Sequence, residues 1–134
     1  MKVTDLMVGD WIEDGYKKSQ VTSITCDGIV ETTAAISNIE VIEPIPLTEE
    51  ILVKNGFEYT YNEVSKMQNK QLLVANIGGH YIEVRLDKKN VAIWYDYDEN
   101  GDGVYSDVLI DLPYNVHKFQ HLLRLCGIEK EITI

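Results

Sequence analysis

The 134-residue sequence lacks any apolar run of the roughly 20 residues that a membrane-spanning helix needs. Its first ten residues also lack the uninterrupted apolar core of a secretory signal peptide, because Asp5 and Asp10 lie there. It has only two cysteines, Cys26 and Cys126, and no C-x-x-C spacing, which is typical of unpaired thiols in a reducing compartment. These absences argue against a membrane protein and a disulfide framework, and they predict a cytoplasmic protein.

Positive charge is also scarce, since 12 Lys and Arg residues stand against 22 Asp and Glu, a formal net charge of −10. Binding to a phosphate backbone depends on cations that displace counterions, so we expect no direct nucleic-acid binding. The simplest interpretation of the charge is that it keeps the protein in solution. The alternative is that its field attracts a basic protein partner.

The acidic excess is concentrated between Val91 and Val116, where no Lys or Arg occurs. Six acidic residues lie in this interval: Asp96, Asp98, Glu99, Asp102, Asp107 and Asp111. Electrostatic complementarity speeds the association of oppositely charged surfaces. The segment Asp96–Asp111 is therefore our candidate contact for a basic protein partner, one that mimics the charge of nucleic acid.

Part of the same segment is similar to the first half of a calcium-binding loop. Asp98, Asn100 and Asp102 occupy the first three ligand positions, and Gly103 occupies the required glycine position. The glutamate expected at the last position is Leu109, and the flanking sequences alternate like strands rather than helices. We favour a hairpin loop, leave weak calcium binding as the alternative, and expect no cofactor.

Alternating residues at the start of the chain predict a series of short strands. The runs Gln20–Cys26 and Ile29–Thr33 flank Asp27-Gly28, which is a strong hairpin signal. Ile36–Ile42 supplies another strand before Pro44 and Pro46 stiffen the exit. Short strands with tight turns at this spacing predict a small SH3-like β-barrel lobe over residues 1–46.

The remaining residues, 47–134, predict a second part with two helices. Thr48 is a helix N-cap, and Gly56 ends that helix as a left-handed cap. Period-two alternation over Phe57–Leu112 predicts an antiparallel meander of four or five strands. A last helix, capped by Asn115 and ended by Gly127, completes an α+β fold.

The last helix places His117 and His121 one turn apart, as in the H-E-x-x-H motif of zinc peptidases. Lys118 occupies the position of the catalytic glutamate, and an ammonium cannot act as that base. Nothing nearby in the sequence supplies a proton acceptor or a third metal ligand, so we expect no enzyme and no metal site. An incidental zinc site with a distant carboxylate is one alternative.

Two further interpretations of the histidine pair are open. In the favoured one, both histidines are half-exposed at a helix edge and make ordinary hydrogen bonds. In the other, His117, His121 and Arg124 present hydrogen-bond donors to a small anionic ligand, on a protein that is otherwise acidic. No P-loop, G-x-G-x-x-G or G-x-S-x-G motif is present to suggest another catalytic class.

Three segments carry a family resemblance: Leu6-x-x-Gly9-Asp10-Trp11, the run Ile42–Phe57 with I-E-P-I-P-L-T, and Val116–Ile128 with V-H-x-x-Q-H-x-L-R-L-C-G-I. Together they resemble a family of short, uncharacterised proteins of anaerobic gut bacteria and of their phages and mobile elements. That family has no established activity, cofactor or catalytic residue. The resemblance implies a small intracellular accessory protein, with a phage as one source of the gene.

The sequence thus predicts a non-enzymatic interaction protein that binds a protein partner through Asp96, Asp98, Glu99, Asp102 and Asp107. The alternative function is small-ligand binding or sequestration by the His117, His121 and Arg124 face.

Overall fold

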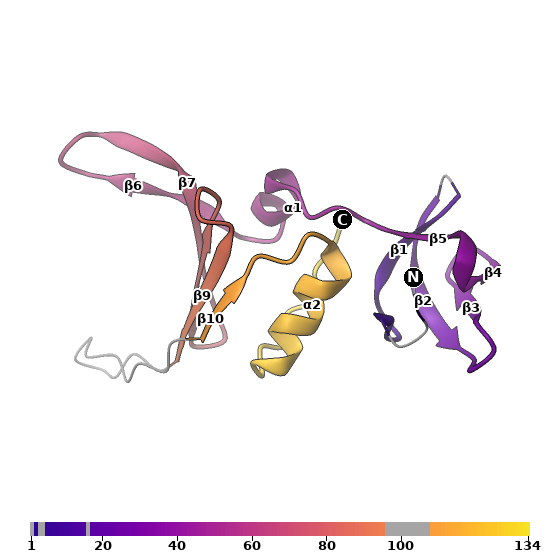
Figure 1. Cartoon of the computed structure of the whole chain (residues 1–134). Coiled ribbons are helices and arrows are strands. Elements are labelled where there is room, and N and C mark those ends of the chain that lie inside the picture. The colour runs from indigo at the N-terminus through magenta and orange to yellow at the C-terminus, as the bar shows by residue number, and fades with distance from the viewer. Residues whose placement is uncertain (1, 3–4, 16, 96–107) are drawn as a thin grey trace. The chain divides into compact units, whose positions relative to one another are not determined.

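The computed structural model describes Lys2 and residues 5–15, 17–95 and 108–134, and these form two antiparallel sheets and two α-helices (Figure 1). The architecture is mostly β with an α+β composition, as the sequence predicts. Neither α-helix of the described residues combines the length and apolar character that crossing a membrane requires. Contacts divide the chain into a first unit (residues 1–47, 113–122 and 131–134) and a second unit (residues 48–112 and 123–130).

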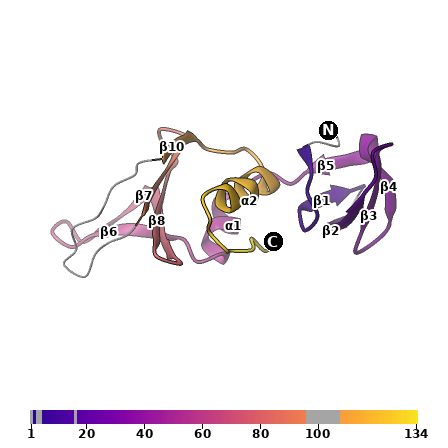
Figure 2. The same ribbon diagram turned by 90° about the horizontal axis from the view of Figure 1, so that it is seen from below.

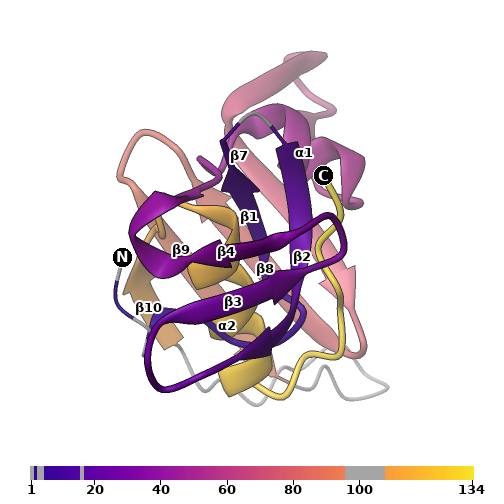
Figure 3. The ribbon, with the colours of Figure 1, turned by 90° about the vertical axis from the view of Figure 1, so that its right-hand side faces the viewer.

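The sheet of the first unit has the strand order β4-β3-β2-β1-β5. Its strands, and the 3-10 turn η2 between the last two, are β1 (Trp11–Asp14), β2 (Lys17–Ile24), β3 (Ile29–Thr32), β4 (Ile36–Asn38), η2 (Ile39–Val41) and β5 (Ile42–Pro44). The Asp27-Gly28 hairpin is confirmed, because β2 and β3 are antiparallel neighbours and Gly28 has a φ of 87°. Figure 3 shows β3 and β4 running across β1.

A register shift between Val21 and Ser23 interrupts the β2–β3 ladder. Such bulges increase the local twist of a strand, which lets this short sheet curl around a small core. That core consists of Leu6, Ile12, Val21, Val30 and Ile42. Strands β4 and β5 are the two edges of the sheet, with no pairing between them among the described residues, so the predicted closed SH3-like barrel is not confirmed.

Helix α1 (Glu49–Lys54) opens the second unit, and its ends form as the sequence predicts. Thr48 Oγ1 accepts a hydrogen bond from Ile51 N at 3.3 Å, which satisfies one of the free N–H groups of the first turn. Gly56 has a φ of 94°, and Phe57 N donates to Leu52 O at 3.1 Å. These are the features of a left-handed C-cap.

The predicted meander is confirmed as a sheet of sequential strands, β10-β9-β8-β7-β6. Figure 2 shows β6, β7, β8 and β10 of this sheet. Its strands are β6 (Glu58–Asn62), β7 (Met67–Ile77), β8 (His80–Arg85), β9 (Asn90–Tyr95) and β10 (Val108–Asp111). The register pairs Leu73 with Val84 and Ile82 with Ile93, and all four side chains are fully buried. One face of this sheet therefore forms the core of the second unit.

Helix α2 (Val116–Leu125) starts in the first unit. Asn115 Oδ1 caps it by accepting from Lys118 N at 3.0 Å, as predicted. Two backbone hydrogen bonds of 2.9 Å attach this start to the exit of β5: Val116 N donates to Ile45 O, and Leu47 N donates to Tyr114 O. The first turn of α2 is thus fixed beside the sheet of the first unit.

Candidate ligand-binding site

A buried carboxylate faces the second histidine of α2. His121 Nε2 lies 2.8 Å from Asp10 Oδ2 and 3.0 Å from Asp10 Oδ1, and Asp10 is fully buried. Asp10 Oδ2 also accepts a hydrogen bond from Met7 N at 2.7 Å. The proton acceptor that the local sequence does not supply therefore comes from a residue 111 positions away.

The turn before β1 holds this carboxylate in place. Gly9 has a φ of 93°, a conformation in which glycine is favoured because it has no Cβ. Gly9 N donates to Val21 O at 2.7 Å, and Val21 N donates to Asp10 O at 2.9 Å. These two hydrogen bonds fix the Gly9-Asp10 turn against β2, and the Asp10 side chain is buried.

The first histidine of α2 is in a different environment. His117 is only 1% exposed, and neither of its ring nitrogens has a hydrogen-bond partner among the described residues. Its ring meets that of His121 edge-on, with 5.7 Å between the ring centroids. The expectation of a half-exposed histidine with ordinary hydrogen bonds is therefore wrong for His117, because this position of α2 faces inward.

Burial lowers the pKa of His117 below its ordinary 6.5. The carboxylates of Asp10 and Asp5 oppose this change in pKa, while the charges of His121 and Lys118 add to it. His117 is accordingly neutral at pH 7. A neutral imidazole offers one N–H donor and one nitrogen acceptor, and here both are buried without a partner among the described residues.

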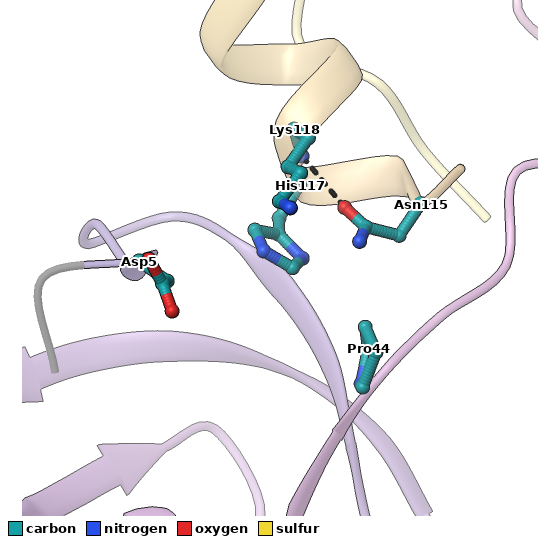
Figure 4. A pocket seen from close by; sticks show the side chains of 5 residues that line it. All are labelled: Asp5, Pro44, Asn115, His117 and Lys118. Atoms are coloured by element: carbon teal, nitrogen blue, oxygen red, sulfur yellow. Dashed lines mark hydrogen bonds between the residues drawn. The ribbon is translucent and has the colours of Figure 1, made fainter. Parts of the chain in front are cut away.

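A cavity of about 240 Å³ opens beside this ring, lined by Asp5, Pro44, Asn115, His117 and Lys118. All five residues belong to the first unit. Figure 4 shows the His117 ring projecting from the start of α2, with Asp5 on one side and Pro44 on the other. Pockets for drug-sized molecules have volumes of about 300–1,000 Å³, so this cavity suits a smaller molecule.

The electrostatic setting of the cavity is unusual for a helix start. The N-terminal end of a helix carries partial positive charge, which acidic residues in the first turn normally offset. The first turn of α2 has no acidic residue and instead contains Lys118, whose ammonium pairs with no carboxylate in the described part of the chain. Both features attract a negatively charged group to this end of the cavity.

The other residues that the sequence singles out lie in different settings. His121 is engaged by Asp10, and Arg124 falls in the part of α2 that belongs to the second unit. Within the described ranges, no three His, Cys, Asp or Glu side chains are grouped to hold a metal ion. The predicted partner-contact and calcium residues lie outside the described residues: Asp96, Asp98, Glu99, Asn100, Asp102 and Asp107.

Several residues of the site escape prediction from the sequence. Asp5 belongs to no recognisable sequence motif, and Asp10 is noticeable only as part of the Gly9-Asp10 turn. Asn115 and Lys118 are visible in the sequence, but as a helix cap and as an obstacle to peptidase chemistry. No sequence pattern identifies His117 as buried, although Val116 beside it and Gln120 three residues later are buried as well.

Comparisons with protein-family models, curated proteins and solved structures gave no match for this chain. The resemblance to the gut-bacterial and phage family therefore stays a prediction, and a function has to be inferred from the site itself.

Proposed function

We propose that the protein is a non-enzymatic binding protein that holds a small anionic molecule in the cavity at the start of α2. The observation that carries this proposal is the buried, unpartnered ring of His117 beside that cavity. A buried polar group without a hydrogen bond costs roughly 1–3 kcal/mol of stability. A ligand that accepts a hydrogen bond from this ring offsets that cost when it binds.

The charges around the cavity support an anionic ligand. Lys118 lines the cavity, and the positive end of α2 lies at the same place. Backbone N–H groups at a helix start and a nearby ammonium are a common combination for binding carboxylates and phosphates.

In this proposal the two histidines have separate roles. His117 contacts the ligand, whereas His121 pairs with Asp10 and so connects the start of α2 to the turn before β1. Arg124 has no assigned contact with the ligand. The predicted ligand-binding face is thereby reduced to His117, with Lys118 and Asn115 added from the same turn.

The test is a screen of small anions by thermal shift and calorimetry, with phosphate, sulfate and acetate as probes. A bound anion at about 100 times its Kd stabilises the folded state by about 2.7 kcal/mol, which raises Tm. We expect this rise in the unaltered protein and its loss in His117→Leu. The matched control is His80→Asn, which alters a histidine of the second unit and keeps the rise. Equal binding by His117→Leu would contradict the proposal.

A second candidate function is capture of a basic protein partner by the acidic segment Asp96–Asp111. Its support is the run of six acidic residues without a cation between Val91 and Val116. Residues 96–107 lie outside the described ranges, so this proposal depends on sequence alone. If charge reversal at Asp98, Glu99 and Asp102 leaves partner capture from a lysate unchanged, the segment is not the contact.

We also propose that the first unit belongs to the SH3-like class and that the protein is cytoplasmic. The pairing of β1 with both β2 and β5 supports the first proposal, together with the 3-10 turn η2 before β5. The two cysteines support the second, because neither forms a disulfide.

A further inference from the structure

We infer that the molecule held at the start of α2 is a small zwitterion that carries both a carboxylate and an ammonium, of which an α-amino acid is the simplest example. This inference rests on the proposed function and narrows its ligand class. It comes from the opposite charges that line a single small cavity, together with a buried ring that has both a donor and an acceptor to satisfy.

The lining of the cavity includes one cation and one anion. Lys118 and the start of α2 attract a carboxylate. Asp5 lines the same cavity, and its carboxylate repels a simple anion such as phosphate. An ammonium group removes this repulsion, because it donates charge-assisted hydrogen bonds to a carboxylate. Asp5 keeps an oxygen for that purpose, since its hydrogen bond from Lys2 N, at 3.0 Å, uses Oδ2.

His117 gives an independent reason for a ligand with both donors and acceptors. An oxyanion can accept a hydrogen bond from the ring N–H, but it leaves the other ring nitrogen without a donor. A zwitterion has a partner for each kind of ring nitrogen, because its carboxylate accepts a hydrogen bond and its ammonium donates one. The ring is neutral and nearly fully buried, so a nitrogen left without a partner retains its cost of desolvation.

The size and polarity of the cavity restrict the rest of the molecule. Its volume is about 240 Å³, and Pro44 is the apolar member of the lining. A single apolar residue covers little of a ligand side chain. The cavity therefore favours an amino acid with a small side chain over a large aromatic one.

The experiment compares four probes by calorimetry on the full chain: L-alanine, acetate, methylammonium and phosphate. We expect L-alanine to bind at least about tenfold more tightly than acetate or methylammonium, because each of these supplies one of the two charged groups. NMR signals of the His117 ring report whether the probe occupies this cavity, and they are expected to shift on addition of L-alanine.

Two variants separate the two ends of the ligand. Asp5→Asn is expected to weaken L-alanine binding about tenfold while acetate binds as before or more tightly. The asparagine keeps an oxygen for the Lys2 N–H, so the N-terminal turn is retained. Lys118→Gln is expected to weaken both L-alanine and acetate. The matched controls are Glu31→Gln and Lys18→Gln, which lie on exposed positions of the same unit and keep the affinity for both probes.

The possible outcomes distinguish this inference from the proposed function. If phosphate or acetate binds as tightly as L-alanine, and His117→Leu abolishes that binding, the anion-binding function stands and the zwitterion is overturned. If Asp5→Asn leaves the affinity for L-alanine unchanged, the zwitterion is also overturned. If none of the probes binds and the wider anion screen leaves Tm unchanged, both proposals fall.

Discussion

The two helices of this protein begin in opposite ways. The first turn of α1 contains Glu49 and Glu50, and its cap Thr48 bonds the backbone of the same turn. Tyr59 also donates to Glu49 Oε2 at 2.5 Å, so even the side chains of this helix start are paired. The first turn of α2 has a cap, Asn115, but no acidic residue.

Two polar side chains of α2 have hydrogen-bond partners in distant parts of the chain. His121 pairs with Asp10, and Gln120 Oε1 accepts from Ile132 N at 2.6 Å. His117 differs from them, since its buried ring nitrogens have no partner in the described part of the chain. The polar groups at the start of α1 have hydrogen-bond partners within the chain, so they do not require a ligand. At the start of α2, the buried ring of His117 has no such partner in the described part of the chain, and a ligand can supply one. This difference between α1 and α2 is the reason why the proposed ligand is placed at the start of α2.

The strongest test of this comparison removes the distant partner of α2. Asp10→Ala removes the carboxylate that accepts from Met7 N and pairs with His121, and it is expected to lower the free energy of unfolding of the first unit by about 3 kcal/mol. Urea unfolding measures this loss through the fluorescence of Trp11 in a Trp94→Phe background. Glu31→Ala, on an exposed position of the same unit, is the control and should change stability by less than about 0.5 kcal/mol.

A loss of less than about 1 kcal/mol in Asp10→Ala would show that the carboxylate does not hold α2 in place. The start of the helix would then depend on the backbone bonds that join it to Ile45 and Leu47, and the contrast with α1 would disappear.

The second test concerns the stability cost of the open site. His117→Leu replaces an unpartnered buried ring with an apolar side chain of similar size, so we expect the free energy of unfolding to rise by about 1–2 kcal/mol. The same substitution is expected to abolish ligand binding. A gain in stability coupled to a loss of binding is typical of residues retained for function. A large loss of stability would show instead that the ring is a structural part of the core.

The pH dependence of stability follows from the same residue. The pKa of His117 is lowered in the folded protein, so the unfolded chain takes up this proton first as the pH falls below 6.5. Stability from this group is therefore complete above pH 6.5 and decreases below it. Asp10, Asp5, His121 and Lys118 are the charged or titratable groups that act on the ring. In His117→Leu, the decrease measured by urea unfolding from about pH 6.5 to about pH 5.5 is expected to be smaller.

The sequence is sufficient where structure depends on neighbouring residues. The caps at Thr48 and Asn115 and the left-handed ends at Gly56 and Gly127 can all be predicted, because each depends on a few residues of one turn. The meander can be predicted for a similar reason, since sequential strands show the same period-two alternation. Closure of the first sheet depends on contacts between its edges, which alternation does not specify.

The site can be predicted only in part because its partners are distant in sequence. The spacing of His117 and His121 identifies the helix face, but no local pattern connects His121 with Asp10. Histidine and glutamine usually lie at least partly in solvent, so the sequence does not place His117 and Gln120 in the core. The cavity needs Asp5 and Pro44 from two other segments, and their proximity follows from tertiary structure.

The smallest expected effect comes from exchanging the charges of the two helix starts. Lys118→Glu places a carboxylate near the positive end of α2 and is expected to raise stability by about 0.5 kcal/mol, while Glu50→Lys lowers it by a similar amount in α1. Urea unfolding at low and high salt measures both changes in stability, and salt should reduce each of them.

The new carboxylate of Lys118→Glu also occupies the place of the ligand's carboxylate, so anion binding is expected to be lost. If Lys118→Glu binds anions as well as the unaltered protein does, the positive end of α2 is not the binding site, and the two helix starts differ in sequence without differing in function.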